Sequence, residues 1–129
     1  MTIAYWCILL ACLLPWLSIG YAKFLAPKAT FKEYDNQAPR DYLSQLKDDR
    51  KRAVWAEKNT YEALPLFIAG VLVAHQAGAD QFLINVLAML FVVLRVTYIG
   101  LYITNLATLR TLCWGSALGC CVAMFLISI

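Results

Sequence analysis

Two charged residues, Glu62 and Arg95, lie at the edges of apolar stretches long enough to read as membrane-spanning. No charged residue falls within residues 63–79, and none within residues 81–94. A charge at bilayer depth is costly, so it must face protein, an opposite charge or a ligand. The opposite signs on neighbouring segments therefore predict a polar site at the rim of a membrane bundle.

Polar and aromatic side chains accompany each charge at helical spacing. At 100° per residue, those near Glu62 share an arc of roughly 80°, and those near Arg95 share an arc of roughly 60°. The candidate binding residues are Arg52, Asn59, Glu62, Arg95, Tyr98, Tyr102 and Trp114, and Trp55 shares the arc of Glu62. A further apolar segment opens with Arg110 and Thr111, and Trp114 lies one turn beyond them.

These groups suit a ligand that is both acidic and basic. Guanidinium groups pair with carboxylates and phosphates, while a single carboxylate suits an ammonium group. A small zwitterionic or anionic ligand with carboxylates and an amine would satisfy the whole set. The alternative is a packing role, in which Glu62 and Arg95 form an interhelical ion pair and Tyr98 and Tyr102 belong to an interfacial aromatic belt.

The elements that must position these residues are membrane helices. The chain has 129 residues, of which 62% are hydrophobic, which is far above the soluble average. Residues 1–129 therefore predict one all-α membrane domain, with helices at about 2–24, 50–77, 80–104 and 109–128. Short connections favour an up-down-up-down four-helix bundle. The first segment lacks the basic start of a signal peptide and exceeds its usual apolar length.

Positive charge is concentrated in one connection. Nine of the 11 Lys and Arg residues lie between the first two apolar segments or at their edges. The positive-inside rule then places the first and third loops in the cytoplasm and both termini outside. Interleaved acidic residues such as Glu33, Asp41 and Asp49 argue against a nucleic-acid patch.

Local patterns add smaller expectations. Residues 41–51 predict a short amphipathic helix on the membrane surface, and residues 78–80 predict a tight turn. Thr108 is a plausible N-cap for the last helix, and Lys58 is expected to project away from the polar stripe and snorkel. The five cysteines show no metal-ligand spacing, so no metal site is predicted.

The pattern resembles the MAPEG family, the membrane-associated proteins of eicosanoid and glutathione metabolism. The matching pieces are Arg52-Ala53-x-x-Ala56-x-x-Asn59-x-x-Glu62-Ala63-x-Pro65-x-Phe67, Arg95-x-x-Tyr98-x-x-x-Tyr102 and Leu109-Arg110-Thr111-x-x-Trp114. Residues 34–40 resemble bacterial members in particular, which implies the bacterial inner membrane.

This resemblance implies a homotrimer with glutathione as co-substrate held between subunits. It assigns Asn59 and Glu62 to the peptide, with Glu62 near the amino group, and Tyr98 and Tyr102 to ligand contact, with Arg95 supporting them. Arg110 would stabilise the glutathione thiolate, because a nearby cation favours the deprotonated thiol. Thr111 occupies a position where some members carry a serine that donates to the sulfur.

The resulting hypothesis is a glutathione-dependent transferase or peroxidase acting on lipophilic electrophiles taken from the bilayer. Arg110 and Thr111 are its candidate catalytic residues. One departure is Glu57, which stands where many members have a histidine. Two alternatives remain: a non-catalytic member of the family, and a small proton-coupled multidrug-type transporter that uses Glu62.

Overall fold

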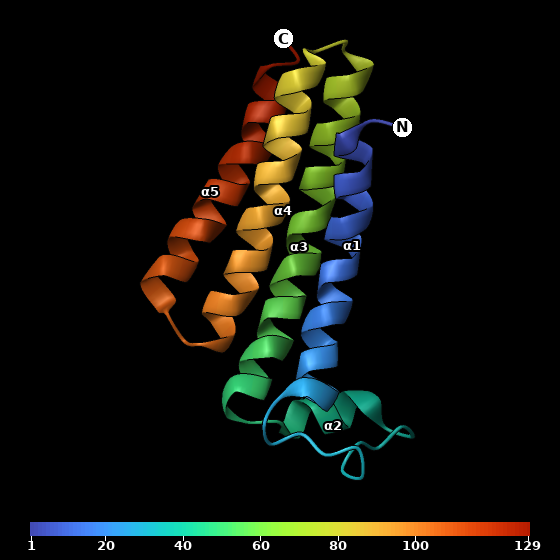
Figure 1. The fold of residues 1–129 in the computed structure, drawn as a ribbon, viewed down its shortest axis with the longest axis vertical. Coiled ribbons are helices and arrows are strands. Elements are labelled where there is room, and N and C mark those ends of the chain that lie inside the picture. Colours follow the sequence, from blue (N-terminus) through green and yellow to red (C-terminus); the bar gives the residue numbers. More distant parts are fainter.

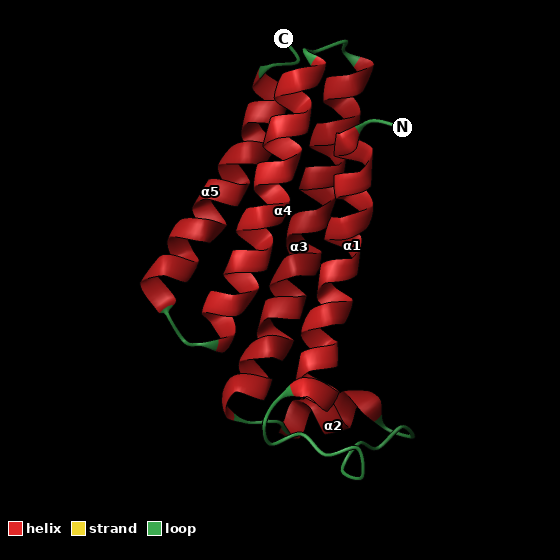
Figure 2. Cartoon of the chain, viewed as in Figure 1, coloured by secondary structure: helices red, strands yellow, loops and turns green.

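The computed structural model describes residues 1–129, and every regular element in it is a helix (Figures 1 and 2). The elements in chain order are α1 (Ile3–Gly20), the π-helical turn η1 (Tyr21–Leu25), α2 (Pro39–Gln45), α3 (Asp48–Gln76), α4 (Gln81–Ile103) and α5 (Ala107–Leu126). The helices α1, α3, α4 and α5 run side by side with alternating direction. Both termini lie at one end of this bundle, and α2 lies at the other (Figure 1).

Three helical segments are long and apolar enough to cross a membrane: Ile3–Leu25, Gln81–Ile103 and Ala107–Leu126. The long helix α3 is not among them, and its first third carries many charged residues. Large apolar side chains are widely exposed on the outside of the bundle, for example Leu17 at 66% and Phe82 at 72%. In a membrane protein these side chains contact lipid.

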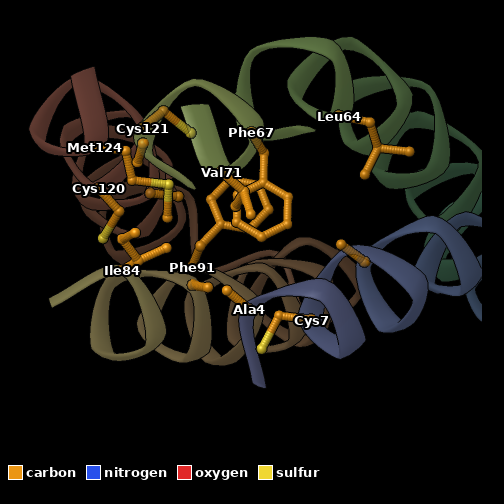
Figure 3. Packing of buried hydrophobic residues seen from close by; sticks show 14 residues of the cluster. Ala4, Cys7, Leu64, Phe67, Val71, Ile84, Phe91, Cys120, Cys121 and Met124 are labelled. Carbon is orange, nitrogen blue, oxygen red and sulfur yellow. The ribbon is translucent and has the colours of Figure 1, made fainter. Parts of the chain in front are cut away.

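The larger of the two buried clusters contains residues of α1, α3, α4 and α5, and Figure 3 shows how they pack. Phe67 of α3 and Phe91 of α4 stack face to face with ring centroids 3.9 Å apart. Gly70 lets α3 approach α5 closely, since a Cβ added there would lie only 3.3 Å from the Cβ of Met124. Small residues at such contacts let helix backbones approach closely in lipid.

The helix ends agree with the sequence at one turn and differ at two other places. Gly78 has φ +73° in the turn before α4, and the Asp80 side chain caps α4 by accepting a hydrogen bond from the Leu83 backbone N–H at 2.9 Å. Thr108 is not the N-cap of α5, because the helix already begins at Ala107. The short helix expected at residues 41–51 is present but with other bounds: α2 spans Pro39–Gln45, and the residues from Asp48 onward belong to α3.

The long connection between η1 and α3 is held in place by Arg50. This arginine is only 8% exposed, and its Nε donates to the Ala22 carbonyl at 2.8 Å. Its other nitrogens donate to the Tyr42 hydroxyl and pair with the Glu33 carboxylate at 3.6 Å. One side chain of α3 therefore fixes the end of the first helix and the basic connection against the bundle.

Candidate functional site

Three cavities meet at Asn59, where the lower halves of α3, α4 and α5 face one another. Their volumes are about 200, 260 and 460 Å³, and Asn59 lines all three. The 260 Å³ cavity is bounded by residues of all three helices, namely Asn59, Tyr98, Tyr102, Arg110, Thr111 and Trp114. Most residues singled out in the sequence are thus brought together at one level of the bundle.

Arg95 is the most deeply buried charged residue of this region, with 1% of its surface exposed. Its Nη2 donates to the Asn59 Oδ1 at 3.2 Å and to the Thr60 Oγ1 at 2.8 Å. Its Nε and Nη1 are buried and make no hydrogen bond within the protein. A buried cation with unpaired donors is expensive, so this arginine is not explained by packing alone.

Glu62 does not form the interhelical ion pair that the packing alternative required. The only two ion pairs in the chain join Lys28 to Asp48 and Arg50 to Glu33. Instead Asn59 stands between the two charges, and its Nδ2 donates to the Glu62 Oε2 at 3.4 Å. The Glu62 side chain is exposed on the surface of the single chain and lines the 200 and 460 Å³ cavities.

Aromatic rings connect Arg95 to the cation of α5. The Arg95 guanidinium carbon lies 4.1 Å from the Tyr98 ring centroid, and Tyr98 meets Tyr102 edge to face at 5.6 Å. The guanidinium carbon of Arg110 in turn lies 4.2 Å from the centroid of the Tyr102 ring. Cation–π contacts of this kind hold a charge in place while leaving its N–H groups free to donate.

The predicted site residues Arg52 and Thr111 differ in their position relative to these cavities. Arg52 does not line these cavities, because its Nε donates to the carbonyl of Ile103 at 2.9 Å and ties α3 to the end of α4. Thr111 lines the 260 Å³ cavity, and its hydroxyl donates to the Ala107 carbonyl at 3.1 Å. Its oxygen can still accept a hydrogen bond from a ligand.

Sequence reasoning missed Lys58. This residue does not project away from the polar stripe but lines the 460 Å³ cavity with Trp55, Asn59, Glu62 and Tyr102. The signal was available, because residues 58 and 62 are four apart and lie on one helix face. A carboxylate, an amide and an ammonium group therefore surround this cavity.

A fourth and larger cavity, of about 680 Å³, opens between α1, α2 and α3. It shares Trp55, Lys58 and Glu62 with the 460 Å³ cavity. Its remaining charged lining consists of Lys23, Arg40, Lys51 and Glu57. The polar face of α3 thus extends around the helix and is open on the side that no other helix of the chain covers.

Fold and cavities together define a class: an apolar helical bundle with a mixed-charge site among three helices. The particular assignment comes from comparison with known families. The profile of the MAPEG family matches residues 3–129, essentially the whole chain, and the protein belongs to this family. No curated protein and no solved structure matches the chain.

Proposed function

We propose that the protein is an integral membrane enzyme that uses glutathione as co-substrate in a transferase or peroxidase reaction on lipophilic electrophiles. One observation carries the proposal. Acidic, amide, ammonium and guanidinium groups surround neighbouring cavities at Asn59, in a chain that belongs to the MAPEG family. A tripeptide with two carboxylates, an ammonium group and a thiol complements these groups.

Each group of the tripeptide has a suitable partner in this arrangement. Glu62 would accept from its ammonium group, and Lys58 and Asn59 would donate to the adjacent carboxylate. Tyr98 and Tyr102 would contact the peptide on the α4 side. Arg110 and Thr111 line the 260 Å³ cavity together with Asn59.

The chemistry follows from the cation at Arg110. A guanidinium group favours the thiolate over the thiol, so the thiol proton passes to water before the reaction. In the transferase reaction the thiolate sulfur attacks an electrophilic carbon, a C–S bond forms, and the leaving group departs with its electron pair. Thr111 would assist by donating a hydrogen bond to the sulfur once its hydroxyl rotates away from the Ala107 carbonyl.

We also propose the assembly that the family pattern implies: four membrane-spanning helices in each subunit, three subunits in a trimer, and the basic connection on the cytoplasmic side. The exposed polar face of α3 supports this. Tyr61 is 44% exposed beside the exposed Glu62, and a carboxylate left open at bilayer depth is costly. A neighbouring subunit would cover this face.

Glutathione binding to the purified protein in detergent tests the proposal. Saturable binding in or below the millimolar range is expected, together with conjugation of 1-chloro-2,4-dinitrobenzene. Absence of saturable binding by folded, oligomeric protein would refute it. Binding without turnover, unaffected by Arg110→Ala, would favour the non-catalytic alternative. Proton-linked efflux that vanishes in Glu62→Gln would favour the transporter.

A further inference from the structure

Arg95 lies at the centre of the site and lines the 200 Å³ cavity, but it does not line the 460 Å³ cavity that holds Glu62 and Lys58. Its exposed fraction is 1%, and it is enclosed by Asn59, Thr60 and Tyr98. Any effect that it has on a ligand in the 460 Å³ cavity must therefore pass through a neighbour, and of these three only Asn59 lines that cavity. Asn59 is the one that lines all three cavities around the site.

The orientation of the Asn59 amide is set by its two neighbours, the Arg95 guanidinium group and the Glu62 carboxylate. A guanidinium group only donates hydrogen bonds, so the Asn59 atom that faces the Arg95 Nη2, 3.2 Å away, must be the oxygen. The amide nitrogen is then left to face the Glu62 Oε2, 3.4 Å away. A carboxylate only accepts, so the second contact requires the same orientation as the first.

We propose that Arg95 is a positioning residue that fixes Asn59 as a hydrogen-bond donor and thereby sets which end of the peptide docks beside it. This inference rests on the proposed function. With the amide held this way, the 460 Å³ cavity presents N–H groups of Asn59 and Lys58 next to the Glu62 carboxylate.

That arrangement selects an α-amino carboxylate. The ligand carboxylate meets the two donors, and its ammonium group meets Glu62. A rotated amide would instead point its oxygen at Glu62 and at the ligand carboxylate, which replaces an attraction by a repulsion. The amino-acid end of the tripeptide, with its free ammonium and carboxylate, therefore docks at Asn59 because Arg95 holds the amide in one orientation.

A double-mutant cycle on glutathione affinity tests this coupling, since contacting residues give non-additive effects. The variants are Arg95→Met, Asn59→Ala and the double substitution, measured by titration calorimetry on the purified oligomer. We expect Arg95→Met alone to weaken binding about tenfold or more. On the Asn59→Ala background the same substitution should weaken binding by no more than about twofold, because the residue through which it acts is gone.

Two further variants separate positioning from folding. Asn59→Asp keeps an acceptor for Arg95 but loses the donor, so it should keep its thermal stability and bind glutathione about tenfold more weakly. Arg95→Lys keeps a donor and should recover part of the affinity lost in Arg95→Met. The matched control is Thr60→Val, which removes the other acceptor of the Arg95 Nη2 and should leave affinity within about twofold.

The outcomes distinguish this inference from the function on which it rests. Wild-type protein that binds no glutathione overturns both. Wild-type binding with an additive cycle, or a Thr60→Val variant as weak as Arg95→Met, overturns the role of Arg95 alone. If Arg95→Met does not fold, Asn59→Asp decides the matter: affinity equal to wild type would overturn the proposal.

Discussion

The bundle contains two clusters of polar side chains, and they differ in how completely their members satisfy one another. The cluster near the termini joins α1, α3 and α4. There the Thr2 Oγ1 lies 3.0 Å from the His75 Nε2, and the His75 Nδ1 lies 2.8 Å from the Val71 carbonyl oxygen. Tyr5 stacks on the His75 ring at 4.3 Å, and Asn85 accepts from the backbone of α1.

The cluster at the opposite end is left incomplete. Arg95 keeps two unpaired nitrogens, Glu62 is exposed, and cavities surround Asn59. Both clusters consist of polar groups in an apolar bundle, so polarity alone does not mark a site. The unpaired groups and the space beside them do. The first cluster fastens helices, and the second is open to a ligand.

The largest expected effect is that of Arg110→Ala in the open cluster. Loss of a group that stabilises developing or existing negative charge typically costs about 10²–10³ in turnover, and a drop of that order is expected here. Conjugation rates with 1-chloro-2,4-dinitrobenzene would measure it. Arg52→Gln is the contrasting variant, because Arg52 bonds the end of α4. It should lower stability but not the turnover of folded protein; equal losses in both would erase the distinction.

A smaller effect is expected in the closed cluster. His75→Ala removes two hydrogen bonds and a ring stack, which should lower thermal stability by the equivalent of about 1–3 kcal/mol. Glutathione affinity should stay within about twofold, because the cluster lies at the far end of the bundle. A large loss of affinity with unchanged stability would contradict the division into two clusters.

The smallest effect concerns the base of α3, outside the membrane-spanning segments. The Tyr21 hydroxyl donates to the Asp49 carboxylate at 2.8 Å, and this bond holds the pKa of Asp49 below its ordinary value. Its contribution to stability is therefore present above the ordinary pKa and is lost as the pH falls through the lower, folded-state pKa. Thermal melts of wild type and Tyr21→Phe should differ at neutral pH and converge in acid; a constant difference would disprove the linkage.

Much of this arrangement could be predicted from the sequence, because helical spacing determines which side chains share a face. Asn59, Glu62, Tyr98 and Arg110 fall on facing stripes, and short loops make their helices neighbours. Lys58 was misplaced although the same spacing puts it beside Glu62.

Other features depend on partners that spacing does not reveal. Arg52 shares the stripe with Asn59, but α3 extends past the end of α4, so its nearest acceptor is the carbonyl of Ile103. The absence of a Glu62–Arg95 ion pair has a similar cause. Asn59 lies between the two charges, where it accepts a hydrogen bond from Arg95 and donates one to Glu62.

Gly70 gives the site a dependence on a place far from it. The helices α3 and α5 are in close contact at Gly70, and the N-terminal end of α5 lies farther from the rest of the bundle (Figure 1). The distance between α3 and α5 at Asn59 and Arg110 thus depends on the absence of a Cβ at Gly70, about three helical turns along α3 from Asn59. A bulkier residue at position 70 would change the tilt of α5 relative to α3. It would thereby alter the distance between Arg110 and Asn59 without contacting either residue.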